Sequence, residues 1–307
     1  MSDPKWDVLG VGCNSVDYVY RLPASPRPDS ATAKLRITSH HVMCGGQTAT
    51  AMAACARFRL RAAYFGCIGH DANGRLITGE LQQRGVDVSA VLTRDCANRF
   101  AVITVDETSG ERIVLWDRDD RLNLSAGDID PALIRAARLV HVDDEDQEAA
   151  ITVARMARQA AVPVTSDIDR VTNRTRDLIE AVSIPMFAEH VLPAMTGESD
   201  PERCLRAVRR WHDGILCVTL GARGAMLLIN DELSYLPALP VTPVDTTAAG
   251  DIFRAGFIFG LLRGHQAGAL LEFANAAAAL SCTKPGAMAS APELREVESA
   301  IAERALR

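Results

Sequence analysis

The stretch VDTTAAGDI, residues 244–252, decides the fold, because a turn of small residues leads there into an apolar helix. Pro243 interrupts regular structure before the turn, and the run IFRAGFIFGLL after it predicts a buried helix that begins near Gly250. The first helical turn then presents free N–H groups, and the side chains of Ala248, Ala249 and Gly250 are too small to block them. The turn is therefore a candidate anion hole.

Asp251 lies in the first turn of this predicted helix. The helix N-terminus favours its ionised form, and a carboxylate beside a phosphate site is the usual acceptor for the proton of an attacking hydroxyl. Asp251 is therefore a candidate general base for phosphoryl transfer. The alternative is that Asp251 merely caps the helix, and this stretch alone does not exclude it.

The composition is typical of a globular protein that acts on small molecules. The chain has 307 residues, 48% of them hydrophobic, so it can bury a full core, and we expect one domain over residues 1–307. The 33 Lys and Arg residues against 39 Asp and Glu residues give a net charge of −6, which argues against a nucleic-acid partner. Without a leader or a long apolar run, we expect a cytoplasmic protein with no membrane partner. The eight cysteines lack metal-binding spacing and are expected to be reduced.

From Leu139 onward, short β-type runs alternate with helical patterns, which is typical of βαβ units. The alternating segments are LVHV (139–142), a helix over 148–160, PVTSD (163–167), helices over 174–181 and 201–213, and ILCVTL (215–220). The expected core is therefore an α/β fold with a mainly parallel sheet covered by helices.

The N-terminal part of the chain has a different pattern. The string FAVITVDETSGERIVLWD alternates with period two around a polar turn at 107–110, which predicts a β-hairpin. We expect a small, discontinuous β-layer from about residues 13–21, 33–44 and 98–118, interrupted by a helix over 47–57. This layer would cover one end of the main sheet as a lid.

Two common nucleotide-binding motifs are absent from the sequence. In GVGCNS, residues 10–15, a serine stands where a dinucleotide fingerprint needs its third glycine, and no G-x-x-x-x-G-K-[ST] string occurs. Any phosphate cradle must therefore be the turn at 248–251.

Three other polar turns are candidate ligand contacts, each with a structural alternative. Gly45 and Gly46 begin a helix and either open backbone N–H groups to a ligand or only make a tight turn. Gly221 and Gly224 follow a sheet strand, where ligands of α/β sheets collect, or they form a plain hairpin. The acidic run that begins at Asp143 could hold sugar hydroxyls or a cation, and a solvated loop is the alternative for most of its members.

Taken together, these strings resemble the ribokinase (PfkB) family of sugar and nucleoside kinases. The string DTTAAGDIFRAGFI satisfies the family's C-terminal signature, in which glycine or alanine is accepted at the two positions before Gly250. The CGGQ, GCIGHDANG and TLGARG strings follow the family's order over nearly the whole chain. The resemblance implies a ribokinase-like three-layer sandwich with a small β-sheet lid, and ATP-dependent kinase activity.

The resemblance also implies roles for individual residues. Asp251 would be the base that deprotonates a sugar hydroxyl, at an anion hole formed by Ala248, Ala249 and Gly250. The implied ATP site comprises Thr219, Gly221, Gly224, Asn275 and Gly286. Mg²⁺ would accompany ATP, with Glu189 as the remnant of the family's N-x-x-E string, whose outer positions are here Ala188 and Val191. A K⁺ ion would lie beside Asp245, Thr247, Ser281, Lys284, Gly286 and Ser290, held largely by backbone oxygens.

The sugar pocket is where the sequence departs from the family. Asp17 matches the family's N-terminal sugar-binding aspartate, and Asp29 resembles a second aspartate of ketohexokinase-like members that reaches in from the lid. Both can accept hydrogen bonds from paired hydroxyls. The family usually has asparagine where this chain has Thr50. Together with Asp143, the sugar-binding candidates are Asp17, Asp29, Gly45, Gly46, Gln47 and Thr50.

We therefore expect an ATP-dependent kinase that phosphorylates a primary hydroxyl of a small sugar or sugar derivative. Asp17 and Asp29 favour ketoses as substrates. One alternative is a nucleoside kinase of the same fold, which would stack a base on lid aromatics. Another is a sugar-binding regulatory protein without turnover. The resemblance further implies a homodimer through the lid strands near Ile37 and Ile113.

Overall fold

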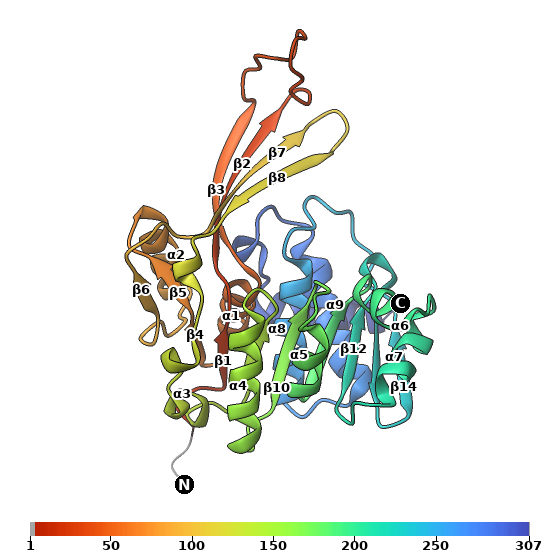
Figure 1. Cartoon of the computed structure of the whole chain (residues 1–307). Coiled ribbons are helices and arrows are strands. Elements are labelled where there is room, and N and C mark those ends of the chain that lie inside the picture. The colour runs from red at the N-terminus through yellow and green to blue at the C-terminus, as the bar shows by residue number, and fades with distance from the viewer. Residues whose placement is uncertain (1–3, 307) are drawn as a thin grey trace.

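The computed structural model describes residues 4–306 and has an eight-stranded main sheet in the order β14-β13-β12-β11-β10-β9-β1-β4 (Figure 1). Pairing is parallel from β4 through β12 and antiparallel for β13 and β14. The strands are β1 Val8–Val11, β4 Ala62–Phe65, β9 Val140–Asp143, β10 Val164–Ile168, β11 Ile184–Ala188, β12 Leu216–Thr219, β13 Ala225–Ile229 and β14 Glu232–Leu236. The predicted parallel α/β core is confirmed.

Helices cover both faces of the main sheet, which is why β1, β4, β9 and β10 are buried along their whole length. One face packs against α3 Pro131–Arg135, α4 Gln147–Gln159, α5 Thr175–Ala181, α6 Val191–Thr196 and α7 Pro201–Arg209. The other packs against α1 Gln47–Arg57, α2 Ala72–Gln83, α8 Ala249–Leu262, α9 Ala267–Ser281 and α10 Leu294–Ala305. The result is the expected three-layer sandwich. A two-stranded sheet, β5 Cys67–Gly69 with β6 Leu92–Arg94, lies beside it.

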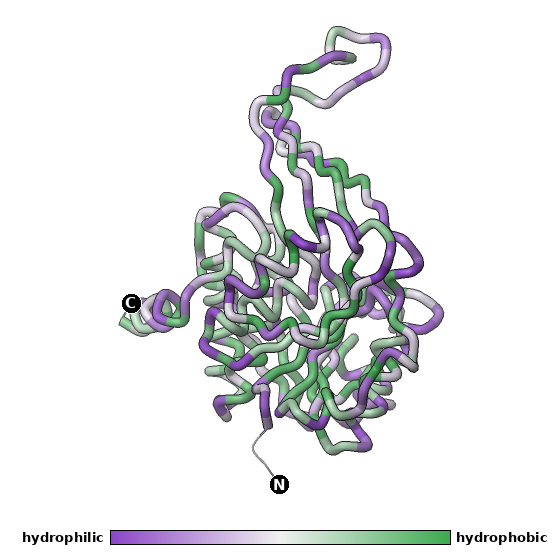
Figure 2. The backbone as a smooth tube through the Cα atoms, turned by 90° about the vertical axis from the view of Figure 1, so that its left-hand side faces the viewer, coloured by the Kyte–Doolittle hydropathy of each residue, from purple (hydrophilic) through white to green (hydrophobic). Residues whose placement is uncertain are grey.

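A separate four-stranded sheet, in the order β3-β2-β7-β8, projects from the main body in two perpendicular views (Figures 1 and 2). Its strands are β2 Ser15–Leu22, β3 Ser39–Gly45, β7 Phe100–Asp106 and β8 Arg112–Asp117. The predicted hairpin is the antiparallel pair β7 and β8. The expected strand over 33–44 begins only at Ser39, because Ser39 pairs with Arg21 near the end of β2 and the residues before it have no neighbouring strand.

The helix after the small-residue turn, α8, begins at Ala249 and is buried from Ile252 to Gly260, as its apolar pattern predicts. It packs on α9, where the rings of Phe259 and Phe273 stack with centroids 4.5 Å apart. Phe58, at the end of α1, contacts both rings edge-on at 6.0 and 5.3 Å. This aromatic cluster joins α1, α8 and α9 near the C-terminal end of α8.

Two absences complete the fold. Within the part of the chain that the structure describes, no helix is long and apolar enough to cross a membrane. The eight cysteines are all free.

Replacing Phe58 by alanine should lower the free energy of unfolding by about 3–5 kcal/mol, because Phe58 is fully buried and its loss leaves a cavity between three helices. Urea denaturation followed by circular dichroism measures this change. The control is Leu76→Ala on the exposed face of α2, expected to stay within about 0.5 kcal/mol of wild type. Equal effects of the two substitutions would contradict the assigned core.

Candidate active site

The start of α8 has the backbone geometry of an anion hole. Ala248, the residue before the helix, adopts a left-handed conformation with φ 62°, and no side chain caps the helix. The N–H of Ala249 reaches the carbonyl of Thr246 at 3.3 Å. The N–H groups of Gly250 and Asp251 have no backbone acceptor among residues 4–306. An anion at this helix end would therefore meet free donors and the positive end of the helix dipole.

Asp251 lies at this point, but its surroundings differ from the sequence expectation. Burial and the neighbouring Asp167 carboxylate raise the pKa of Asp251 well above its usual range, whereas Arg254 acts to lower it. The expectation that the helix N-terminus alone keeps Asp251 ionised is therefore wrong. The reason is that Asp167 belongs to β10, far away in sequence. A carboxyl with a raised pKa accepts a proton more readily near neutral pH, which suits a general base.

A groove of about 430 Å³ opens beside the anion hole. Thr219, Gly221 and Gly224 line one side of it, from the end of β12 and the turn before β13. Ala249 and Gly250 line it at the start of α8. The groove therefore shares its wall with the anion hole, and it is concave and largely apolar, as nucleotide-sized pockets are.

Asn275, on α9, also lines this groove, and its Nδ2 donates to the carbonyl of Leu236 at 3.0 Å. Gly286, the fifth predicted ATP contact, is not among the lining residues. Glu189 follows β11 and forms an ion pair with Arg223, in the turn between Gly221 and Gly224. The turn itself joins antiparallel strands, so it is a hairpin that also lines the groove.

The predicted cation residues are only partly brought together. Asp245 accepts hydrogen bonds from the N–H groups of Thr247 and Gly286, both at 2.9 Å. Burial acts to raise the pKa of Asp245, but these hydrogen bonds outweigh burial and lower it. The carboxylate thus ties the turn before α8 to the loop after α9.

The other three cation candidates have partners of their own. Lys284 is paired with Glu296 at 2.8 Å, and Ser281 and Ser290 donate to the carbonyls of Ala278 and Ala287. Among residues 4–306, no group of three or more His, Cys, Asp or Glu side chains could hold a metal ion.

Asp143 joins three segments at the carboxyl end of β9. Its Oδ2 accepts hydrogen bonds from the N–H of Cys13 and the hydroxyl of Thr48, both at 2.7 Å, and its Oδ1 accepts from the N–H of Glu145 at 3.1 Å. A Cβ on Gly12 would stand 2.2 Å from Oδ2, so only glycine fits there. These bonds favour an organising role for Asp143 in the wall of the sugar pocket.

The acidic run after β9 is not the solvated loop that its charge suggested for most of its members. Asp143 and Asp144 are 1% and 2% exposed. Asp144 accepts hydrogen bonds from the N–H groups of Asp169 and Arg170 at 2.8 and 2.6 Å. Backbone donors therefore stabilise these carboxylates in place of water, which a sequence pattern cannot show.

Asp17, on the lid strand β2, lies at the mouth of the predicted sugar pocket. Ser15 donates to its Oδ1 at 2.8 Å, and a Cβ on Gly45 would stand 2.9 Å from its Oδ2. Burial raises the pKa of Asp17, against the effect of the Ser15 hydrogen bond. Asp17 and Gly45, two of the predicted sugar-binding residues, are therefore neighbours.

The helix after Gly45 begins with the other candidates. Gly46 has φ 96° and approaches Asn14 so closely that a Cβ would stand 2.4 Å from its Cα, so the tight-turn alternative accounts for this glycine. Gln47 is the half-buried first residue of α1. Thr50, one turn later, is fully buried and its hydroxyl has no partner among the described residues.

Asp29 is not close to Asp17 in this structure. It is exposed, with φ 52°, in the loop between β2 and β3 at the far end of the lid (Figure 1). A role for Asp29 in the sugar pocket stays a prediction that requires movement of this loop.

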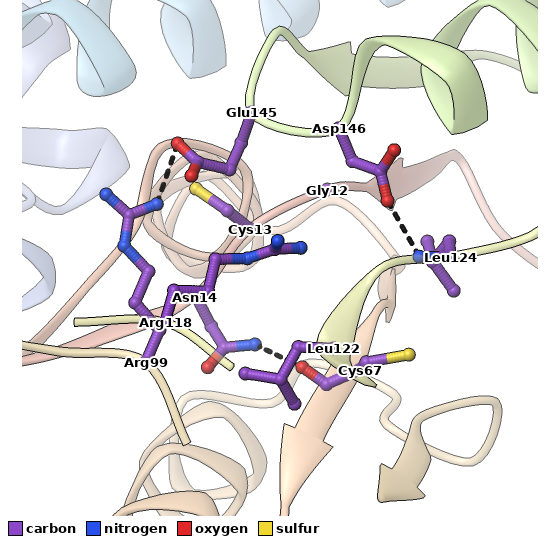
Figure 3. Close-up of a pocket in the computed structure, with 10 residues that line it drawn as sticks. All are labelled: Gly12, Cys13, Asn14, Cys67, Arg99, Arg118, Leu122, Leu124, Glu145 and Asp146. Atoms are coloured by element: carbon purple, nitrogen blue, oxygen red, sulfur yellow. Dashed lines mark hydrogen bonds and ion pairs between the residues drawn. The ribbon is translucent and has the colours of Figure 1, made fainter. Parts of the chain in front are cut away.

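A second, small pocket of about 20 Å³ lies under the base of the lid (Figure 3). Arg99 extends along one side and pairs with Glu145 at 2.8 Å, while the guanidinium of Arg118 points into the middle of the residues drawn. Asn14 donates to the carbonyl of Cys67 at 2.9 Å at its floor. The pocket therefore adds two arginines to the site.

Sequence reasoning missed five residues of this site: Thr48, Arg99, Arg118, Asp167 and Arg254. Only Arg254 carried a signal, as a charged residue inside the otherwise apolar run IFRAGFIFGLL. The others are ordinary polar residues in the sequence, and only the folded chain brings them to the site.

A parallel sheet, an anion hole at a helix start, a neighbouring groove and a lid define an ATP-dependent kinase of sugars or nucleosides. The chain belongs to the pfkB family of carbohydrate kinases, whose pattern matches residues 15–294. It is therefore a phosphotransferase of the ribokinase type.

Two relatives and a ligand complex illustrate the similarity. The chain is 31% identical to the ATP-dependent ribose-1-phosphate kinase of Halopiger xanaduensis over 97% of this chain and 98% of that protein. A putative ribokinase from Agrobacterium tumefaciens superimposes with a TM-score of 0.90 at 28% identity, covering 98% and 99% of the two chains. Arabidopsis thaliana ribokinase, complexed with ribose and ATP, gives 0.84 at 25% identity with the same coverage.

Replacing Thr48 by valine should destabilise the protein by about 1–3 kcal/mol, because the buried Asp143 carboxylate loses a hydroxyl donor. Chemical denaturation measures the effect. The matched control is Thr93→Val on the exposed strand β6, expected to lie within about 0.5 kcal/mol of wild type. An unchanged Thr48→Val protein would contradict the role assigned to the Asp143 junction.

Proposed function

We propose that this kinase transfers the terminal phosphoryl group of ATP to a primary hydroxyl of a small sugar or sugar derivative, with Asp251 as the general base. One observation carries the proposal: the start of α8 faces two sites at once. Ala249 and Gly250 line the groove that suits a nucleotide, and the adjacent Asp251 lies within electrostatic reach of Asp143, which organises the sugar pocket.

The reaction would proceed by in-line displacement. The sugar hydroxyl gives its proton to a carboxylate oxygen of Asp251 while its oxygen forms a bond to the terminal phosphorus, and the bond from that phosphorus to the ADP oxygen breaks. The N–H groups of Gly250 and Asp251 would donate to the phosphoryl oxygens as charge shifts on to them. Mg²⁺ bound with ATP would neutralise phosphate charge.

The sugar itself is a finer proposal. A ketose preference rests on Asp17 and Asp29 acting together, so it requires the outer lid loop to bring Asp29 inward. A second candidate is a sugar that already carries an anionic group. It is supported by Arg99 and Arg118 at the pocket under the lid and by the similarity to a ribose-1-phosphate kinase.

Replacing Asp251 by asparagine should lower kcat by about 10²–10⁴-fold, because the amide cannot accept the hydroxyl proton. ADP release from Mg-ATP is measured across ketoses, aldoses, ribose 1-phosphate and nucleosides, in potassium and in sodium buffers. The KM for ATP should stay near the wild-type value, and potassium should raise turnover. The control is Asp213→Asn, an exposed acid in the loop before β12, whose other end, at Thr219, lines the groove.

The panel separates the candidates. Turnover of fructose that Asp29→Asn weakens supports the ketose preference, whereas turnover of ribose 1-phosphate that Arg118→Met weakens supports the anionic sugar. A nucleoside as the best substrate favours the alternative within the same fold. Wild-type turnover by Asp251→Asn would refute the assignment of the base.

We also propose a homodimer formed through the lid. The edge strand β8 exposes apolar side chains, with Ile113 53% and Leu115 62% exposed, and the opposite edge strand β3 exposes Val42 at 48%. Ile37, expected in a lid strand, lies instead in the loop before β3 and is 45% exposed. The contact would therefore be centred on β8.

Light scattering at micromolar concentration should give the mass of two chains for the wild type and of one chain for Leu115→Glu, because a buried unpaired carboxylate would oppose association. Leu76→Glu, at an equally apolar but helical surface position, should remain dimeric. A monomeric wild type defeats the proposal.

A further inference from the structure

Arg254 is the one charged residue in the buried segment Ile252–Gly260 of α8. Its Nη2 lies 2.6 Å from Oδ1 of Asp167 on β10, and the two side chains are 3% and 4% exposed. The free energy needed to remove two charges from water is about as large as the free energy gained from their attraction. A buried ion pair therefore adds little stability compared with apolar side chains of similar size. The neighbours of the pair indicate a different role.

The guanidinium lies against the anion hole. A Cβ on Gly250 would stand 2.6 Å from Nη1 of Arg254, so the two residues are in direct contact across one helical turn. Asp251 precedes Arg254 by three residues, which makes them neighbours on the helix surface. Positive charge is therefore held beside the free N–H groups that would receive phosphoryl oxygens.

Both members of the pair act on Asp251. Asp167 acts to raise the pKa of Asp251 and Arg254 to lower it, in addition to the larger effect of burial. From the other packed segments, Asp143 at the end of β9 and Asp169 after β10 also act to raise this pKa. The base is thus surrounded by three carboxylates and one guanidinium.

His141, which faces the same region from β9, adds no charge near neutral pH. Burial and Arg254 lower the pKa of His141 to about 3, and its Nδ1 lies 3.0 Å from the hydroxyl of Thr165. Among the described residues, its Nε2, the Nε of Arg254 and the hydroxyl of Ser166 have no hydrogen-bond partner. The charge balance near the base is therefore set by the neighbouring carboxylates and by the pair, not by a titrating histidine. Burial also raises the pKa of Asp167, and Arg254 acts against this effect.

We propose that Asp167 and Arg254 are a positioning pair for Asp251, in which Arg254 fixes and balances the charge of the carboxylate and Asp167 holds Arg254 in place. The proposal rests on the proposed function, because it takes Asp251 as the base. Arg254 favours the carboxylate before the reaction, and Asp167 favours the protonated carboxyl that forms when the sugar hydroxyl gives up its proton. The two opposed charges keep Asp251 able to accept and release a proton near neutral pH.

The test is the pH dependence of kcat/KM for the sugar at saturating Mg-ATP, for the wild type, Arg254→Met, Asp167→Asn and the double variant. The acid limb of this profile reports the essential base. Arg254→Met removes a positive charge, so the pKa of Asp251 rises and the limb moves to higher pH by about one unit. At a pH below the limb, kcat/KM should then be roughly tenfold lower than for the wild type. Asp167→Asn removes a negative charge, so the limb moves to lower pH.

The double variant has neither charge, and its limb should return toward the wild-type position. Protonation of ATP is common to all four proteins and does not affect the comparison. Thermal melting and the affinity for ATP monitor the fold. If Arg254→Met alone does not fold, because it leaves Asp167 buried and unpaired, the double variant is compared with Asp167→Asn, and its limb should lie at higher pH.

Limbs that move in the same direction in both single variants, or that stay fixed while activity falls, would overturn the pair's role and leave it as a structural contact. A failure of the proposed function would give a different result. Asp251→Asn would then retain turnover, regardless of where the acid limbs of the other variants lie.

Discussion

The site depends on one constraint at the start of α8: the chain must turn from an extended loop into a buried helix without covering the first N–H groups. Ala248 meets this constraint with a left-handed backbone conformation and a small side chain, and no side chain caps the helix. Burial of the helix from Ile252 onward, together with the aromatic cluster of Phe58, Phe259 and Phe273 near its other end, then holds it against its neighbours. Donors at this end are therefore fixed in position before any ligand arrives, which is the condition for electrostatic stabilisation of a transferring group.

The other parts of the site are arranged around this helix end by buried carboxylates. Asp245 ties the turn before α8 to the loop after α9, and Asp143 ties β9 to the start of α1. Asp167 holds Arg254 beneath Gly250. Each carboxylate joins segments that are distant in sequence, so the groove beside α8, Asp251 and the predicted sugar pocket are parts of one connected structure.

The sequence predicted the features that depend on local pattern. The helix over 47–57, the hairpin of β7 and β8 and the start of α8 are where periodicity, turn residues and small side chains place them. Residues 33–38 were expected in a strand because their pattern is compatible with one. Strand formation also needs a neighbour, and the register of β2 with β3 leaves these residues without one.

The sequence identified candidate residues of the site better than it predicted the surroundings of each side chain. The motif located Asp251, but its raised pKa depends on Asp167, which lies 84 residues earlier in the chain and reaches it only through the sheet. Similarly, Asp143 was recognised as a candidate ligand, while the donors Cys13 and Thr48 that occupy its oxygens come from other segments. Such long-range contacts leave no periodic trace in a sequence.

The central claim is that the fold gives Asp251 the electrostatic environment of a proton acceptor. The most direct measurement is a ¹³C NMR titration of the Asp251 carboxyl carbon in the ligand-free protein, with the resonance assigned by its loss in Asp251→Asn. The account predicts a titration midpoint clearly above about 3.9, the ordinary value for aspartate, since burial and Asp167 disfavour the charged form. A midpoint at or below about 3.9 would show that the helix N-terminus and Arg254 dominate, and it would contradict the account.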